Sequence, residues 1–346
     1  MNRFAYLVRR LLLAIPTFLG ITLVCFGLTR VLPGGPVEIR LARLRALGGA
    51  TEGAGAARVA AVTEAQRIEL NRQFGFDRPF FVQYGRWLVR DRMGLRMASY
   101  DHPDRTAWDL IRSRFPVSLW FGVTGFVLSY LVCIPLGIAK ALRHGTRFDA
   151  ATSLLVFVGY ALPAFAVGML LKMLLCGTVE GLWDVFPLGG FESAAAATAA
   201  WPRRLADRAW HMGLPVFCYL MGSFAVLTLL MKNALLDQVG SDYVRAVLAK
   251  GATRRRAIWG HALRNALIPI ATGFGAILTV FFAGSVVIER VFEIPGMGRL
   301  SLDAVEGRDY AVFMAILAVT STLQLLGNLL SDFCYMLIDP RIHFGR

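Results

Sequence analysis

Charged residues are scarce in this sequence of 346 residues. They make up 17% of the chain, whereas hydrophobic residues make up 56%. In an ordinary soluble domain about a quarter of the residues are charged, so the composition argues against a soluble protein and favours a membrane protein. The net charge of +14 comes from Lys and Arg residues that lie between long apolar runs. This distribution fits membrane topology and contact with anionic lipid rather than a continuous nucleic-acid-binding face.

Sequence patterns that carry chemistry are also missing. There is no GxxxxGK[ST] loop, and no glycine is followed directly by lysine, so the sequence lacks the loop that cradles ATP phosphates. The cysteines form no CxxC pair and have no histidine partners at zinc spacing, which favours a role in packing. They are Cys25, Cys133, Cys176, Cys218 and Cys334. We therefore expect this chain to have no enzymatic activity and to bind no metal or cofactor.

Six uncharged stretches are long enough to cross the roughly 30 Å of hydrocarbon in a bilayer. They run from Leu11 to Thr29, Phe115 to Ala139, Ala150 to Leu171, Met212 to Met231, Ala266 to Ile288 and Tyr310 to Ser331. The first follows basic residues, as a signal peptide would, but it is too long for a signal core and lacks a small-x-small cleavage site. We therefore expect an all-α polytopic membrane protein with six transmembrane helices.

The basic residues predict the orientation of these helices, because short loops rich in Lys and Arg stay in the cytoplasm. The turn after the second span carries Lys140, Arg143 and Arg147, and the connection 232–265 carries seven basic residues against two acidic ones. In the two short loops on the opposite side, acidic residues outnumber basic ones. Both termini are then expected in the cytoplasm.

The segment 31–114 is longer than the roughly 60 residues over which the charge rule holds. It contains 14 arginines, yet it must lie outside if the other loops are placed correctly. It opens with prolines and glycines at 33–36 that break the first helix, and the part from 63 to 100 has the pattern of short amphipathic helices. We expect a small external domain here. The chain then divides into 1–30, with the N-terminus and first helix, the external domain 31–114, and a core 115–346 with a cytoplasmic loop at 233–265.

The most informative stretch is the internal connection 241–270. Helical projection places Tyr243, Val244, Val247 and Leu248 on one face and Arg245, Ala246, Ala249 and Lys250 on the other. Gly251 suits a helix stop, and Thr253 suits the cap of a second, basic helix. A short helix with small exposed residues and basic ends can dock closely on another protein. The same pattern also suits an amphipathic helix on anionic lipid, and the charges alone leave both interpretations open.

A family resemblance favours the docking interpretation. The stretch 243–269 resembles the cytoplasmic EAA-type coupling loop of ABC importer permeases, in the form typical of the dipeptide, oligopeptide and nickel family. The matching residues are Arg245, Ala246, Ala249, Lys250, Gly251, His261, Ala262, Leu263, Arg264, Asn265, Ala266 and Pro269. Arg245 stands where the name-giving motif has Glu, as is usual in the peptide branch. The resemblance implies ATPase-coupling roles for Tyr243, Arg245, Ala246, Ala249, Lys250, Gly251, Arg264 and Asn265.

The resemblance extends over nearly the whole chain. Residues 289–300, ERVFEIPGMGRL, are close to the family's Glu-x-Val-Phe-x-x-Pro-Gly-x-Gly-x-Leu signature. Other segments that look like family patterns are the opening 6–16, the Leu-Pro-Gly-x-Pro exit at 32–36, the external segment 76–87 and the Asp-Pro-Arg ending at 339–341. Residues 147–165 look most like the branch that includes the microcin C permease.

The resemblance implies a type I ABC importer permease of the bacterial cytoplasmic (inner) membrane. Such a chain forms half of a pathway for peptides or peptide-like solutes and works by alternating access. The implied partners are a second, homologous permease, two cytosolic ATPase domains that hold ATP and Mg²⁺, an external substrate-binding protein and the lipid bilayer, with no nucleic acid. The alternatives are an autonomous ion-coupled transporter, for which we find no mid-membrane ionisable residues, and an intramembrane enzyme, for which we find no clustered nucleophile and base.

Several single residues have two interpretations. Candidates for an external gate are Glu289, Pro295, Gly296 and Gly298. Glu289 together with Arg290 could latch such a gate, although helix capping and loop packing are the favoured alternative. Lys172 and Asp332 lie near the ends of expected spans and could contact the solute. For both of them, snorkelling or a structural ion pair is favoured.

Overall fold

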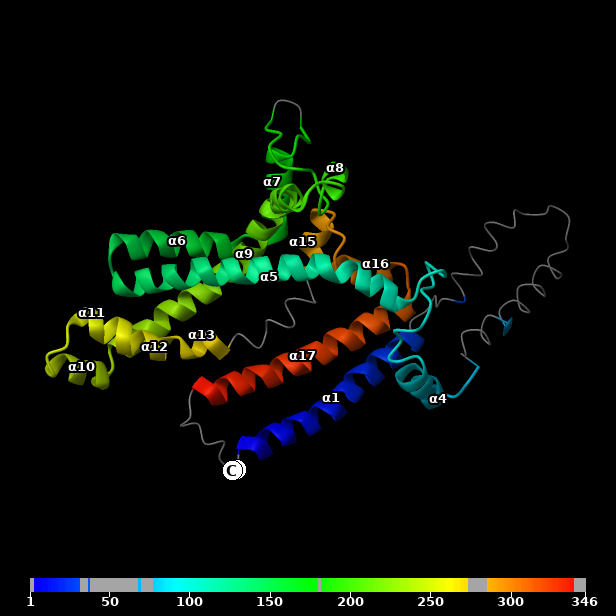
Figure 1. The fold of residues 1–346 in the computed structure, drawn as a ribbon, viewed down its shortest axis with the longest axis horizontal. Coiled ribbons are helices and arrows are strands. Elements are labelled where there is room, and N and C mark those ends of the chain that lie inside the picture. Colours follow the sequence, from blue (N-terminus) through cyan, green and yellow to red (C-terminus); the bar gives the residue numbers. More distant parts are fainter. Residues whose placement is uncertain are drawn as a thin grey trace. The chain divides into compact units, whose positions relative to one another are not determined.

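Helices account for the regular structure in the residues that the computed structural model describes, which are 3–31, 77–179, 182–272 and 285–338 with the isolated positions 37, 68 and 69. The α-helices are α1 (Arg3–Val31), α4 (Phe80–Gly85), α5 (Ala107–Leu142), α6 (Arg147–Ala161), α7 (Ala164–Leu175), α8 (Ala194–Ala197), α9 (Trp201–Val239), α10 (Asp242–Ala249), α11 (Arg254–Arg256), α12 (Leu263–Ala266), α13 (Ile268–Thr272), α15 (Val286–Val291), α16 (Met297–Glu306) and α17 (Tyr310–Ile338) (Figure 1). Two π-helical segments are η1 (Arg86–Arg90) and η2 (Ala257–Ala262). The all-α class expected from the sequence is confirmed.

Three of these helices are long and apolar enough to cross a membrane by themselves. They are α1 over Val8–Val31, α5, and α17 over Tyr310–Phe333. Two bent pairs also pass the test, namely α6 with α7, and the two halves of α9, so the described residues hold up to five spans. The remaining expected span, 266–288, falls largely on 273–284, which lie outside the described residues. The total of six therefore stays a prediction.

The two bent pairs break at residues that interrupt helices. The axes of α6 and α7 differ by 92°. Between them Leu162 is extended and Pro163 caps α7, because a proline disfavours helical geometry in the residue before it and lacks an N–H. The halves of α9, Trp201–Gly222 and Phe224–Val239, are bent by 48° at a Gly–Ser pair, a sequence at which helices commonly kink.

The chain forms two compact units, which we describe separately. The first comprises Met1–Leu12, Arg114–Arg299 and Leu323–Arg346, and the second comprises Leu13–Ser113 and Leu300–Thr322. Two apolar cores lie in the described part of the first unit. The α15 core joins α5, α9 and α15 through buried residues that include Phe121 and Phe292. The α10 core joins the second half of α9 to α10 and η2 through Leu235, Val244 and Ala257.

The second unit is organised by aromatic side chains. The ring of Phe26 in α1 packs edge-on against those of Phe80 and Tyr84, with a centroid distance of 5.6 Å in each pair. The Tyr84 hydroxyl lies 2.8 Å from the Thr22 hydroxyl, and Trp87 is buried. The short helices expected within 63–100 are thus present as α4 and η1. Most of the segment 31–76 lies outside the described residues, so the external domain stays a prediction.

Candidate functional site

The candidate coupling helix α10 is fixed to α9 through one face. Val244 is 2% exposed and packs in the α10 core. The Tyr243 hydroxyl donates a hydrogen bond of 2.8 Å to the side-chain oxygen of Gln238 in α9. Since α9 ends at Val239 and α10 begins at Asp242, the connection between the two helices is only two residues long. The packing and the short connection hold α10 directly against the second half of α9.

The opposite face of α10 is open, as the sequence predicts. Arg245, Ala246, Ala249 and Lys250 are all exposed. One expectation was wrong: Leu248 was placed on the inner face with Val244, but it is 41% exposed. The helix has only eight residues, and its inner contact is narrower than the four-residue face of the projection. The exposed surface therefore combines two small alanines, two basic residues and an apolar side chain.

The end of α10 has the expected stop. Gly251 has a φ of +85°, which confirms the helix-stop conformation predicted from the sequence. Its N–H donates to the carbonyl of Leu248 at 2.9 Å, and the N–H of Ala252 donates to the carbonyl of Val247 at 3.3 Å. These two bonds form a Schellman motif, which satisfies carbonyls that the helix leaves unpaired.

The second part of the connection begins at the predicted cap. The Thr253 side chain accepts a hydrogen bond from the N–H of Arg256 at 3.3 Å. The basic helix expected to follow is not uniform, because α11 passes into the π-helical η2 and then into α12. Ala257 and Ala262 of η2 are buried in the α10 core, whereas Arg264 and Asn265 are exposed. The structure thus brings the predicted coupling residues together, with Tyr243 half-buried and the other seven exposed.

The candidate gate residues form a closed turn around a carboxylate. Glu289 is completely buried. Its Oε2 accepts the N–H of Arg299 at 2.8 Å, and its Oε1 lies 3.4 Å from the Ser118 hydroxyl, which also accepts the N–H of Met297 at 2.7 Å. Burial raises the pKa of Glu289 to about 7, although the Arg299 N–H and the Ser118 hydroxyl favour the charged form. Glu289 thus ties the end of α15 to α5 and to the start of α16.

The two glycines of this segment are required by the close approach of the turn. A Cβ added at Gly296 would lie 2.6 Å from the Glu289 carboxyl carbon, and one added at Gly298 would lie 2.9 Å from the backbone of Val286. Pro295 is half-buried beside them. The arrangement agrees with the favoured loop-packing interpretation, and a gating role stays a prediction.

The two ionisable residues near span ends both have ion pairs. Lys172 Nζ lies 3.2 Å from Glu293 Oε1 and donates to the carbonyl of Val291 at 3.0 Å. Arg10 Nη1 lies 2.6 Å from Asp332 Oδ2. The structure therefore agrees with the favoured structural role of Lys172 and Asp332.

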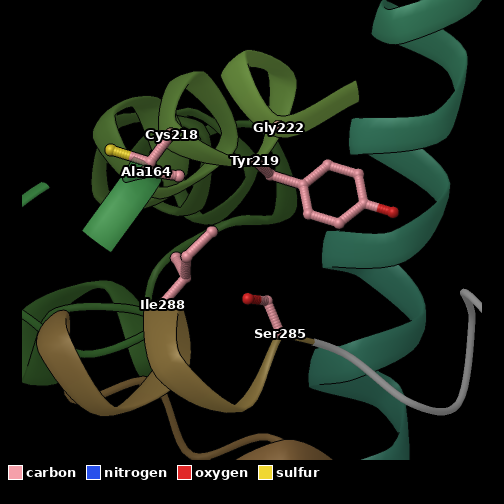
Figure 2. Close-up of a pocket in the computed structure, with 6 residues that line it drawn as sticks. All are labelled: Ala164, Cys218, Tyr219, Gly222, Ser285 and Ile288. Atoms are coloured by element: carbon pink, nitrogen blue, oxygen red, sulfur yellow. The ribbon is translucent and has the colours of Figure 1, made fainter. Parts of the chain in front are cut away.

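A cavity of about 310 Å³ lies where both bent pairs break. It is lined by Ala164, Cys218, Tyr219, Gly222, Ser285 and Ile288. Figure 2 shows Ile288 and the Ser285 hydroxyl on one side and the α9 residues on the other. Ala164 is the first residue of α7, and Gly222 is the last residue before the bend of α9. In transporters, interrupted helices commonly line the solute site.

Sequence analysis did not identify these lining residues. The Tyr219 ring lies against Gly125 of α5, where an added Cβ would be 2.7 Å from the ring, and no local pattern links positions so far apart in the chain. The usable signals were the helix breakers themselves, Pro163 and the Gly–Ser pair at 222–223.

Comparison with known proteins identifies the family. The model of the binding-protein-dependent transport system inner membrane component matches residues 133–344. The chain belongs to this family. The permease therefore has the type I ABC importer permease fold that the sequence predicts, and it is a multi-pass protein of the inner membrane.

Curated relatives match the permease over nearly its whole length. It is 36% identical to the inner membrane ABC transporter permease protein YejB of Escherichia coli O157:H7, over 99% of this chain and 100% of that one. It is also 36% identical to the peptidoglycan transport system permease protein YejB of Agrobacterium fabrum, over 99% of each chain. The oligopeptide transport system permease protein AppB of Bacillus subtilis is 33% identical, over 98% of this chain and 99% of that one.

Proposed function

We propose that this permease and a homologous partner chain form the pathway of an importer for peptides or peptide-like solutes. The names of its relatives, which refer to oligopeptide and peptidoglycan transport, support this solute class. The other proposed partners are two cytosolic ATPase domains, which bind ATP and Mg²⁺, and an external solute-binding protein. In this assembly the permease itself carries out no chemical step, and both of its termini lie in the cytoplasm.

The observation that carries the proposal is the geometry of α10. Its inner face is packed on α9, while Arg245, Ala246, Ala249 and Lys250 are exposed beside the Gly251 stop, with Arg245 Nη1 3.5 Å from Asp242 Oδ1 of the same helix. Alanines allow close approach of a partner surface, and the basic ends can pair with acidic groups on it. Movement of the ATPase domains would therefore displace α10 together with α9, and α9 lines the cavity.

The role proposed for the cavity follows from its position. It lies at the break of each bent pair, so bending there changes its shape directly. The hydroxyls of Tyr219 and Ser285 can exchange hydrogen bonds with peptide main-chain groups, and Ile288 and Cys218 offer apolar contact. We assign this cavity to the solute pathway on that basis.

A variant of the exposed face tests the docking role. Ala246→Asp places a larger, charged side chain on the contact surface, whereas Ala246→Ser retains a small residue. The aspartate variant should insert normally but lose most co-purification with the ATPase domains and most uptake, because a buried, unpaired charge at an interface is costly. The serine variant should keep both. Membrane abundance, co-purification and uptake are measured in parallel.

Full uptake by the aspartate variant at normal abundance would show that α10 is not the coupling element and would favour the lipid-surface interpretation.

The purified permease alone should hydrolyse no ATP, and turnover that responds to loaded binding protein should appear only when the ATPase domains are added. Robust hydrolysis by the isolated chain would contradict the assignment of catalysis to partner subunits.

A further inference from the structure

Three buried charged residues connect three helices of the first unit. Lys140 of α5, Asp149 of α6 and Lys232 of α9 are 0%, 6% and 9% exposed. Lys232 Nζ lies 2.8 Å from each oxygen of the Asp149 carboxylate, and Lys140 Nζ lies 3.2 Å from Asp149 Oδ1. We call these three residues the Lys–Asp–Lys cluster.

Neighbouring groups complete the hydrogen bonding of the cluster. Lys140 Nζ donates to the hydroxyl of Ser153 at 2.7 Å and to that of Thr152 at 2.9 Å, and it also donates to the carbonyl of Asp149 at 3.1 Å. The N–H of Gly145 donates to Asp149 Oδ2 at 3.2 Å, and His144 Nδ1 lies 3.2 Å from the same oxygen. These groups restrict the cluster to one geometry, because moving any of its members would leave a buried charge unpaired.

The cluster lies beside the attachment point of the coupling helix. Lys232 follows Met231 in the second half of α9, and Met231 and Leu235 belong to the core that buries Val244 of α10. A continuous series of contacts therefore runs from α10, through the α10 core, to Lys232. From Lys232 it continues to α6 and α5. The two bends, at 162–163 and at 222–223, come after the cluster on the way to the cavity.

Stability alone does not account for an ionic group at this position. Taking charges out of water is costly, and apolar residues of similar volume often stabilise a buried site equally well or better. Hydrogen bonds to ions are, however, directional, and displacing one of the three ions would leave a buried charge unpaired. An ionic connection therefore suits helices that must move together as one rigid body.

We propose that Lys140, Asp149 and Lys232 are positioning residues of the transport cycle. They hold α6, the cluster end of α5, the second half of α9 and α10 as one rigid block. When α10 is displaced, the chain then bends at 162–163 and 222–223, beside the cavity, and the helices of the block do not move relative to one another. This inference rests on the proposed coupling role of α10.

The test compares a broken cluster with an apolar one in the complete transporter. Asp149→Asn leaves two buried ammonium groups without a counter-charge and should lower the abundance of the assembled complex. The triple variant Lys140→Met, Asp149→Leu, Lys232→Met removes all three charges and should restore abundance and co-purification with the ATPase domains. In the triple variant, the number of solute molecules moved per ATP hydrolysed should nevertheless fall by about fivefold or more. A fivefold change is the lower end of the typical range for coupling between sites.

A matched control removes an ion pair of the same unit that lies outside the cluster, namely the one between Arg10 of α1 and Asp332 of α17. Arg10→Met with Asp332→Leu should leave the solute moved per ATP unchanged. A triple variant that assembles normally and keeps the wild-type ratio would overturn the positioning role and show a purely structural cluster. A triple variant that still fails to assemble would also overturn it, because the proposal requires that the charges be dispensable for folding. Failure of the unmodified permease to bind the ATPase domains would instead refute the proposed function.

Discussion

At the scale of single residues, Glu289 connects a sequence motif with the packing that explains it. In the sequence, the glutamate, the proline and both glycines belong to one signature. From it we expected helix capping and loop packing rather than a gate latch, but the signature does not show which atoms pack together. The structure shows that the turn folds back over its own carboxylate, so an added Cβ at Gly296 would collide with it. Nothing in the spacing of the motif indicates which atoms surround the carboxylate, because Ser118 comes from a helix far earlier in the chain.

The pKa of Glu289 gives a testable dependence of stability on pH. Burial raises this pKa from 4.5 to about 7, so the folded state binds the proton more tightly than the unfolded chain does. The contribution of Glu289 to stability is therefore full at acidic pH and is lost as the pH rises through about 7. The melting temperature of the purified permease should fall between about pH 5 and about pH 8, and Glu289→Gln should make that fall smaller.

Glu293→Gln is the matched control, because the Glu293 side chain is 62% exposed. Because this variant retains the buried Glu289 carboxyl, its melting temperature should still fall between about pH 5 and about pH 8. Equal slopes for the wild type and Glu289→Gln would show that the buried carboxyl does not titrate in this range.

Gly251 gives a second prediction at the same scale. A Cβ at this position would meet no atom within 4 Å, so a substitution there is opposed by the positive φ and not by crowding. Gly251→Val should cost about 1–2 kcal/mol locally and reorient α10. Gly251→Asn should cost less, because asparagine adopts the left-handed region more readily. We expect normal membrane abundance for both variants and reduced ATPase co-purification and uptake for valine alone. Equal uptake by the two variants would contradict a role for this backbone conformation.

At the scale of elements, the accuracy of the sequence predictions depended on the distance between the interacting residues. The end of α10 and the cap at Thr253 were predictable, because each depends on hydrogen bonds within a few residues. The inner face of α10 was predicted less well, and Leu248 was misplaced because only tertiary contacts decide how much of a short helix is covered. The connection between Asp149 and Lys232 was missed, since these residues are 83 positions apart and no local sequence pattern links them.

The cavity between the broken helices gives a prediction at this scale. Ser285→Phe should fill much of the space beside Ile288 and Tyr219, whereas Ser285→Ala removes only the hydroxyl. The phenylalanine variant should retain ATPase binding but lose most uptake, because the obstruction is remote from α10. The alanine variant should keep uptake within a few fold, since one hydrogen bond contributes about 1 kcal/mol. Normal uptake with phenylalanine would place the solute pathway elsewhere.

At the scale of the whole molecule, composition and hydropathy predicted an all-α membrane protein, and the resemblance of its motifs predicted the family and its fold. Hydropathy also predicted six spans. The described residues hold up to five of them, because the fifth expected span falls mainly on 273–284. The alternation of charged loops predicts that both termini are cytoplasmic, and this prediction depends on electrostatics at the membrane and not on any contact within the chain.

Cysteine labelling tests that topology. Single cysteines at Arg143 and Arg254 should react only with reagents that enter the cytoplasm, whereas cysteines at Ala56 and Asp184 should react with an impermeant external reagent. Labelling of intact and permeabilised cells separates the two groups. External labelling at position 254 would overturn the proposed orientation, while internal labelling at position 56 alone would relocate only the segment 31–114.

The right-angled break between α6 and α7 has a consequence for the membrane around the protein. With a rise of 1.5 Å per residue, the 15 residues of α6 and the 12 residues of α7 measure about 22 Å and about 18 Å. At 92° their combined reach is about 28 Å, which nearly equals the hydrocarbon thickness, although neither helix alone could cross it. Opening or closing this angle lengthens or shortens the span. In the proposed cycle, where this angle changes, neighbouring lipid would thicken or thin, and bilayer thickness would act as a mechanical load on transport.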